Sequence, residues 1–168
     1  MSLSPTLYMM IGLPGSGKSH WVKEFLSKMK GDENGQIYYP IIASTDDYIE
    51  NIAKRNCRTY NQMFKELIKE AQKECHAEVR YAIAHDKDCI WDQTNLTQKS
   101  RMKKLDRFPD YYKKVAVVVS CTDHNEWMRR INNRPGKIIS LSILDSMAKS
   151  FEYPMPSEGF DEYVEIFN

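Results

Sequence analysis

Eight residues near the N-terminus constrain the fold more than any other part of this sequence. Residues 12–19 read Gly-Leu-Pro-Gly-Ser-Gly-Lys-Ser and match the pattern Gly-x-x-x-x-Gly-Lys-Ser/Thr. The short apolar run 7–11 comes directly before them, and a helical pattern begins at Lys18. A strand, a glycine-rich loop and a helix in this order are what a phosphate-binding loop requires. We therefore predict that this segment binds the phosphates of a nucleotide.

Glycines supply the backbone freedom that such a loop needs. The chain has only seven glycines, yet Gly12, Gly15 and Gly17 fall close together, and residues without a Cβ let successive N–H groups face one anion at a helix N-terminus. Lys18 is then expected to reach the β- and γ-phosphates and the Ser19 hydroxyl to bind Mg²⁺. The alternative is a glycine-rich turn without a ligand, which would not require Lys-Ser at this position. The predicted nucleotide-binding residues of the loop are Gly12, Pro14, Gly15, Ser16, Gly17, Lys18 and Ser19.

Strands and helices are predicted to alternate along the rest of the chain. The predicted strands are residues 7–11, 37–43, 89–91, 115–119 and, more weakly, 163–167. The predicted helices are 18–29, 60–84, one capped by Thr97, one from Asp123 to Pro135-Gly136, and 143–151. This alternation predicts a three-layer α/β fold with a mainly parallel sheet and a ligand site at the carboxyl ends of the strands.

Composition and missing motifs narrow the class of protein. The 168 residues suffice for one domain, predicted over residues 1–168, and 42% hydrophobic residues exclude disorder. The sequence has no Asn/Thr-Lys-x-Asp segment for reading guanine, and a large ATPase motor needs a longer chain. A small kinase that uses ATP and Mg²⁺ is therefore favoured.

Charge and cysteine content bear on partners and compartment. Lys and Arg number 24 against 23 Asp and Glu, so any polyanion would need a local patch. The four cysteines have no metal-ligand spacing, which favours reduced, mostly buried thiols. No apolar run approaches the roughly 18 residues of a membrane span, and the N-terminus lacks a signal-peptide pattern. We expect a cytoplasmic protein without a membrane partner, in the host cytoplasm if the chain is phage-encoded; its oligomeric state is left open.

Two carboxylates, Asp46 and Asp47, directly follow the second predicted strand. By themselves they are explained as first-turn acids of a helix that Thr45 caps. Beside a nucleotide site, however, transfer to a hydroxyl needs a carboxylate that orients the nucleophile and takes its proton. Consecutive positions on a helix diverge by about 100°, so only one of the two can face the phosphate loop. The one nearer the strand, Asp46, is the predicted general base, and both are predicted to lie at the substrate.

The third predicted strand is followed by Asp92, Thr94 and Asn95. A carboxylate at the end of this strand can hold Mg²⁺ or its bound water, and an asparagine can orient the substrate. The alternative is an Asx-type turn before the helix at Thr97.

Basic residues form two further groups. Arg130 and Arg134 share a helix face ahead of Pro135. This pattern is typical of a lid that contacts a triphosphate, and we predict such a lid at about residues 129–142. The alternative, cations that complement a helix dipole, suits Arg129 better. The helix after Asn95 carries a run that could contact nucleic-acid phosphates or form an ordinary solvated face, namely Lys99, Arg101, Lys103, Lys104 and Arg107.

Taken in order, these segments resemble the kinase domain of phage T4-type polynucleotide 5′-hydroxyl kinases, which are P-loop kinases. The resemblance covers about residues 7–150, most of the chain. It implies transfer of the γ-phosphate of ATP to a 5′-hydroxyl of DNA or RNA, with single-stranded or end-frayed nucleic acid as the acceptor. By position it implies a nucleotide and metal role for Lys18 and Ser19, a general base at Asp46, a substrate side at Thr94 and Asn95, and lid arginines at Arg130 and Arg134.

Two positions depart from the family pattern. The family has an arginine that holds a nucleic-acid phosphate at the position of Ile49. The family also has an acidic residue directly before Thr-Asn, whereas this chain has Gln93 there and Asp92 one position earlier. No Asp-x-Asp-x-Thr phosphatase motif occurs in the sequence. Ile49 and the near-neutral charge favour a second hypothesis, a small-molecule or toxin-like kinase acting on a sugar or nucleotide hydroxyl. A third is a nucleotide-dependent binding module without an acceptor.

Overall fold

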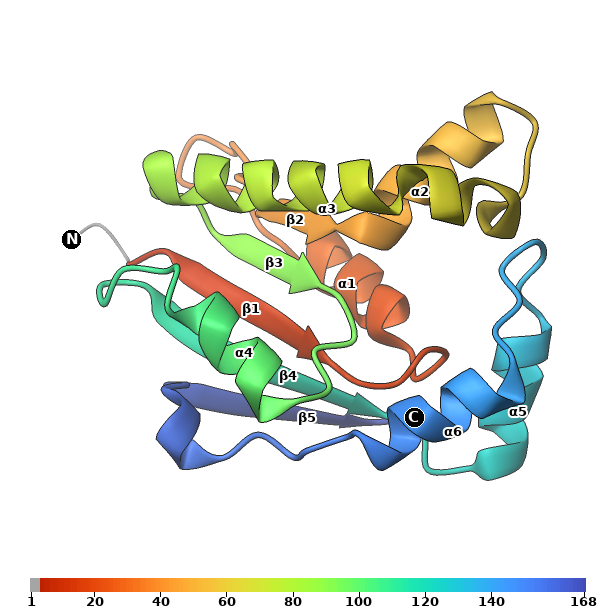
Figure 1. Cartoon of the computed structure of the whole chain (residues 1–168). Coiled ribbons are helices and arrows are strands. Elements are labelled where there is room, and N and C mark those ends of the chain that lie inside the picture. The colour runs from red at the N-terminus through yellow and green to blue at the C-terminus, as the bar shows by residue number, and fades with distance from the viewer. Residues whose placement is uncertain (1–3) are drawn as a thin grey trace.

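Five strands form a sheet in which every neighbouring pair is parallel, in the order β2-β3-β1-β4-β5 (Figure 1). The computed structural model describes residues 4–168. The strands are β1 (Thr6–Ile11), β2 (Ile41–Ser44), β3 (Cys89–Asp92), β4 (Lys113–Ser120) and β5 (Glu162–Phe167). Strand β1 lies in the middle of the sheet, which explains why its residues Leu7, Met9, Met10 and Ile11 are all fully buried. The predicted parallel sheet is confirmed.

Helices cover both faces of this sheet, as a three-layer α/β fold requires. Helix α1 packs Val22 against Met10 on one face, whereas α3 and α4 pack Val79 and Leu105 near Met9 on the other. Neighbouring residues of β1 serve opposite faces because side chains alternate along a strand. The helices are α1 (Lys18–Ser27), α2 (Thr45–Arg55), α3 (Tyr60–Ala84), α4 (Gln98–Leu105), α5 (His124–Asn132), α6 (Leu141–Lys149) and the 3-10 turn η1 (Pro156–Glu158).

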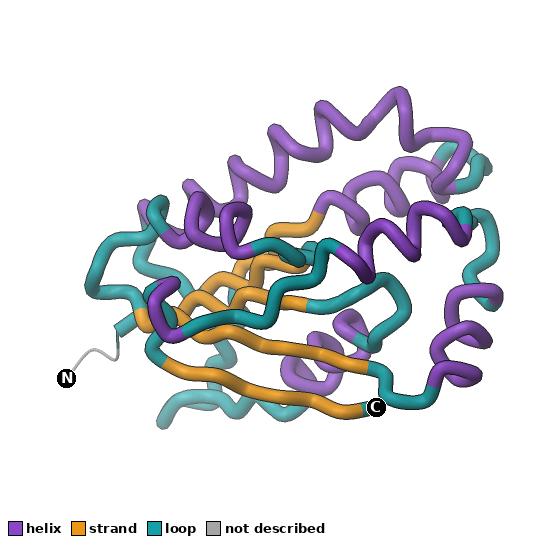
Figure 2. Tube along the Cα trace, turned by 60° about the horizontal axis from the view of Figure 1, so that its bottom comes forward, coloured by secondary structure: helices purple, strands orange, loops and turns teal. Residues whose placement is uncertain are grey.

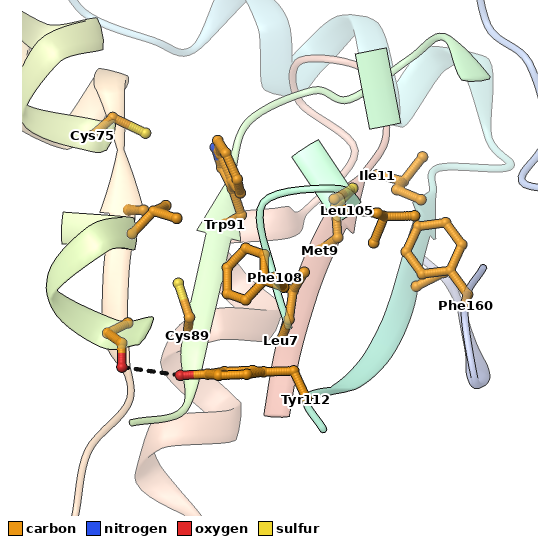
Figure 3. Packing of buried hydrophobic residues seen from close by; sticks show 14 of the residues in the cluster. Leu7, Met9, Ile11, Cys75, Cys89, Trp91, Leu105, Phe108, Tyr112 and Phe160 are labelled. Atoms are coloured by element: carbon orange, nitrogen blue, oxygen red, sulfur yellow. Dashed lines mark hydrogen bonds between the residues drawn. The ribbon is translucent and has the colours of Figure 1, made fainter. Parts of the chain in front are cut away.

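The larger core is packed around Trp91, on β3 (Figure 3). The Trp91 ring lies 6.2 Å from that of Phe108, which in turn lies 5.1 Å from that of Tyr112, measured between centroids. The Tyr112 hydroxyl donates a 2.9 Å hydrogen bond to the Ala82 carbonyl of α3. This packing joins α3 to β3 and so holds the strand that ends in Asp92.

Strand β2 is shorter than predicted. The sequence predicts residues 37–43, but pairing with β3 begins only at Ile41, and Tyr38 and Tyr39 are exposed. The reason is that β3 itself begins at Cys89, opposite Ile41, so the residues before Ile41 have no partner strand.

Several helix ends also differ from the prediction. Helix α1 ends at Ser27 rather than residue 29, and α6 spans 141–149 rather than 143–151, because Ser140 accepts from the Ile143 amide and caps it. Helix α2 is capped by Ser44 and not by Thr45, through a 3.2 Å bond from the Asp47 amide. The predicted caps Thr97 and Asp123 are confirmed.

The cysteines are less buried than predicted. Cys75 and Cys89 lie in the core, but Cys57 is exposed and Cys121 is partly so. Cys57 lies two residues after the end of α2, with a φ of 53°, in the turn that leads to α3.

Helix α5 lies beyond the carboxyl ends of the strands rather than over a face of the sheet (Figures 1 and 2). The predicted lid, about residues 129–142, corresponds to the end of α5, the loop 133–140 and the start of α6, and its function as a lid stays a prediction. Within residues 4–168, no helix is long and apolar enough to cross a membrane.

One member of the basic run on α4 is buried, which corrects the interpretation of that run as a phosphate-contacting or solvated face. Arg101 has no exposed surface and forms two 2.7 Å hydrogen bonds with the Glu158 carboxylate, itself buried. Its remaining nitrogen donates to the carbonyls of Asn95, Leu96 and Glu152. Arg101 therefore ties the C-terminal segment to the loop after β3.

Replacing Arg101 with Met is expected to lower the free energy of unfolding by about 3–5 kcal/mol, because it leaves the Glu158 carboxylate buried without its counter-charge. Urea unfolding followed by circular dichroism measures the effect. Lys103→Met, at an exposed position of the same helix, is the control and should change stability by less than about 0.5 kcal/mol. If the free energy of unfolding fell no more than in the control, the Arg101–Glu158 pair would contribute nothing to stability.

Candidate active site

A cleft of about 1000 Å³ opens at the carboxyl ends of the strands. Of the predicted site residues, the cleft is lined by Pro14, Gly15, Gly17, Lys18, Ser19, Asp46, Asp47, Asp92, Thr94, Asn95, Arg130 and Arg134. Gly12 and Ser16 belong to the same loop but do not line the cleft. The structure thus brings together side chains from four separate segments of the sequence.

Neighbouring elements hold the glycine-rich loop in shape. The Gly12 amide donates to the Thr94 carbonyl at 3.0 Å, and a Cβ at Gly12 would lie 2.4 Å from the Val119 carbonyl oxygen. The indole of Trp127 on α5 donates to the Pro14 carbonyl at 2.7 Å. Contacts with neighbouring elements therefore fix the shape of the loop, and Gly12 is needed for close packing.

Polar groups of the loop and lid fit an anion. The Ser16 hydroxyl and the Arg134 Nη1 atom are buried, and neither has a hydrogen-bond partner within residues 4–168. Among the described residues, the Lys18 ammonium donates only to the loop's own carbonyls, those of Gly12 and Leu13, each at 2.9 Å. Burial lowers the pKa of Lys18 to about 8, although Asp92 and Asp46 oppose this effect. Phosphate oxygens would satisfy these donors, so the loop fits the phosphates of ATP.

The two lid arginines differ in their partners. Arg130 donates to the Glu126 carboxylate at 2.7 Å, within α5. Arg134 follows α5 and makes no ion pair among the described residues. Arg134 is thus the lid cation that is available to a ligand without breaking an existing pair.

The predicted general base is held on both sides. Asp46 Oδ1 accepts from the Tyr60 hydroxyl at 2.7 Å, and Oδ2 accepts from the Lys137 ammonium at 2.6 Å. Burial by itself would raise the pKa of Asp46, but the Lys137 charge and the two hydrogen bonds outweigh it, so the pKa lies below its usual value. Lys137 also binds Glu50 at 2.5 Å and lies 4.2 Å from the centre of the Tyr60 ring.

Two further carboxylates of the cleft, Asp47 and Asp92, have pKa values shifted in the opposite direction. Burial and the charges of Glu50 and Asp46 raise the pKa of Asp47. Burial raises the pKa of Asp92 to about 6, although Lys18 opposes the effect. Asp92 and the Ser19 hydroxyl offer the oxygen ligands that Mg²⁺ prefers, and both line the cleft. Their metal role stays a prediction.

Side-chain hydrogen bonds hold the loop after β3. Asn95 is 3% exposed with a φ of 48°, and its amide donates to the Met10 carbonyl at 2.6 Å. The Lys104 ammonium binds the side-chain oxygens of Gln93 and Asn95. Gln93 also donates to the Thr45 hydroxyl at 3.2 Å. Asn95 therefore supports the loop, and its predicted contact with a substrate stays a prediction.

Sequence reasoning missed Tyr60 and Glu50 as site residues and gave no role to Lys137. Tyr60 is the first residue of the predicted helix 60–84, and its hydroxyl gives no separate sequence signal. Glu50 follows Asp46 by four positions, so its place on the same helix face was the one available clue.

A family model with the description "AAA domain" matches residues 7–154. Among curated proteins, heterogeneous nuclear ribonucleoprotein U-like protein 2 of mouse and of human is 24% identical over an alignment of 160 residues, which covers 92% of this chain and 20% of each relative. The chain therefore spans about a fifth of the length of these relatives.

Solved structures with similar folds include several kinases. A candidate kinase from Chloroflexus aurantiacus has a TM-score of 0.67 at 11% identity and covers 99% of this chain and 87% of its own. A chain of the Pnkp1/Rnl/Hen1 RNA repair complex scores 0.62 at 19%, with coverages of 89% and 45%. A gluconokinase from Sinorhizobium meliloti scores 0.53 at 19%, with coverages of 98% and 83%. At these identities the likeness shows the fold alone, which is that of P-loop kinases.

Proposed function

The chain belongs to the AAA domain family, and from this premise we propose that it is an ATP-dependent polynucleotide kinase that phosphorylates a 5′-hydroxyl of DNA or RNA. One observation carries the proposal: a single cleft is lined by cations that no carboxylate binds within residues 4–168 and by an oriented carboxylate. Arg134 and Lys18 lie there, and no carboxylate of the described part of the chain binds them; Asp46 is held in the same cleft by Tyr60.

Each residue then has a role in phosphoryl transfer. ATP, when bound, supplies the phosphoryl group, and Ser19 and Asp92 would hold Mg²⁺, which neutralises phosphate charge. Lys18 and Arg134 stabilise the negative charge on the transferring group. Asp46 accepts a hydrogen bond from the acceptor hydroxyl and takes its proton as the oxygen attacks.

A nucleic-acid acceptor is supported by the proteins that this chain resembles. One solved neighbour is a chain of an RNA repair complex, and the curated relatives are ribonucleoproteins by name. The exposed basic residues Lys99 and Lys103 of α4 and Arg107 just after it remain available for backbone phosphates, although Arg101 does not.

A second candidate is a kinase for a sugar or nucleotide hydroxyl. Asp47 and Glu50 line the cleft beside Asp46, and carboxylates suit hydroxyl groups better than they suit phosphates. Ile49 is fully buried against α3, so nothing at that position contacts an acceptor phosphate.

An acceptor panel tests the proposal. Oligonucleotides with a 5′-hydroxyl, nucleosides and gluconate-type sugars are incubated with Mg²⁺ and ATP labelled in the γ-phosphate. Label on oligonucleotides alone supports the proposal, and label on sugars or nucleosides alone supports the second candidate. ATP binding without any labelled acceptor would instead identify a nucleotide-dependent binding module.

Oligonucleotide binding should weaken as salt is added. Cations of the protein release counterions from the nucleic-acid phosphates that they contact, and a higher salt concentration opposes this release. We expect log Kd to change with log salt concentration by about 0.7 for each phosphate contacted, with only a few contacts in total. Fluorescence anisotropy of a labelled single strand between low and moderate salt measures the slope. A slope near zero would contradict a nucleic-acid acceptor and favour the small-molecule kinase.

A further inference from the structure

We propose that Tyr60 and Lys137 are positioning residues that orient the Asp46 carboxylate and set its charge state. This inference rests on the proposed function, because it assigns these residues to the base of that reaction. It concerns a cluster of four side chains, namely Asp46 and Glu50 of α2, Tyr60 of α3 and Lys137 of the loop 133–140.

The cluster leaves Asp46 able to accept one more hydrogen bond. Tyr60 and Lys137 bind one carboxylate oxygen each, and a carboxylate has about four acceptor sites. The Asp46 side chain is still 50% exposed toward the cleft, whereas that of Lys137 is only 10% exposed. Two anchors therefore restrict the rotation of the carboxylate while its free sites face the space that an acceptor hydroxyl would use.

Tyr60 and Lys137 reach Asp46 together because their backbones are joined. Asn61 donates through its amide N–H to the Gly136 carbonyl at 2.9 Å. Its side chain donates to the Ile138 carbonyl at 2.8 Å and accepts from the Ile138 amide at 2.7 Å. Lys137 is thus clamped between two residues that are bonded to the first turn of α3, next to Tyr60.

Close packing supports the same clamp. Gly136 has a φ of 71°, and a Cβ there would lie 2.7 Å from the Thr59 Cβ. Only glycine lets the lid loop approach α3 closely enough to place the Lys137 ammonium over the Tyr60 ring.

Other charges also act on Asp46. The titratable and charged groups around it are Tyr60, Lys137, Arg134, Glu50, Asp47, Lys18 and Asp92. Lys137 and Tyr60 are the two that bind the carboxylate directly, so their removal should leave burial and the neighbouring carboxylates to raise its pKa. An ionised base is needed for turnover, so a higher pKa moves the acid limb of the rate profile to higher pH.

The test compares Tyr60→Phe and Lys137→Met with matched controls. Tyr111→Phe removes another tyrosine–aspartate bond of 2.7 Å, to Asp86, and Lys149→Met removes another lysine–aspartate pair of 2.6 Å, to Asp145. Neither control residue lines the cleft. Lys137→Arg is added as the variant that keeps the charge.

We expect kcat to fall by up to about 10²-fold in Tyr60→Phe and Lys137→Met, with the KM for ATP unchanged. The acid limb should rise by about 1–3 pH units in Lys137→Met and by less in Tyr60→Phe, while Lys137→Arg and both controls follow the wild type. Profiles of Tyr60→Phe and Lys137→Met that match those of the controls would overturn the inference.

Carbon-detected NMR titration of the Asp46 carboxyl in the full chain gives a readout that does not depend on turnover. The wild type should titrate below the usual range for aspartate, and Lys137→Met above the wild type. If no acceptor is ever phosphorylated, the proposed function fails, yet this titration still decides whether the cluster sets the charge of Asp46. Identical titration curves in the wild type and both variants would refute that role.

Discussion

Asp46→Asn is expected to lower kcat by about 10²–10⁴-fold with little change in ATP binding, because it removes the group that takes the proton of the acceptor. The pKa of Asp46 lies below its usual value, so the folded protein favours the charged form, and this stability is present at neutral pH and lost as the pH falls. The substitution should therefore also lower the melting temperature modestly. Rates are measured well below that temperature, with labelled ATP and saturating acceptor.

Asp47→Asn is the matched comparison, one position along the same helix. The pKa of Asp47 is raised by burial and by Glu50 and Asp46, so the folded protein disfavours its charge. Neutralising it should leave stability unchanged or slightly higher, and turnover within about 10-fold of the wild type. If Asp47→Asn abolished turnover and Asp46→Asn were mild, the assignment of the base would be off by one residue.

Lys18→Ala is expected to lower the rate of phosphoryl transfer by at least about 10²-fold, because it removes a preorganised cation at the transferring phosphate. The fold should survive, since the Lys18 ammonium bonds only to the carbonyls of its own loop. Lys28→Ala, at an exposed position just after the same helix, is the control. Circular dichroism checks the fold, and an unchanged transfer rate in Lys18→Ala would remove the basis for the phosphate-loop assignment.

The same lysine gives ATP binding a characteristic pH dependence. Burial lowers the pKa of Lys18 to about 8 in the ligand-free protein, and bound phosphates should raise it. Binding then takes up a proton near this pH, so ATP affinity should fall as the pH rises through 8. Calorimetry in buffers of different ionisation enthalpy detects this uptake, which should be absent in Lys18→Ala.

The sequence alone determined the features that depend on residues close to one another along the chain. The phosphate loop, the 25-residue helix α3 and the caps at Thr97 and Asp123 are encoded within a few positions, by glycine spacing, apolar period and side chains that bond nearby amides. The parallel sheet followed from the alternation of strands and helices. The boundaries of β2 did not, because they depend on where its partner β3 begins.

The tertiary structure decided the partners of the site residues. The four segments that line the cleft lie at one edge of the sheet, as the sequence predicts. Nothing local indicates that Asp46 bonds to Tyr60, 14 positions away, and to Lys137, 91 positions away. The same holds for Arg101. Its neighbours in the sequence are mostly basic and typical of a solvent-exposed helix, yet Arg101 pairs with Glu158, 57 positions away. A charged side chain carries the same sequence signal whether it is exposed or buried against a counter-charge, and only the packing of distant segments distinguishes the two.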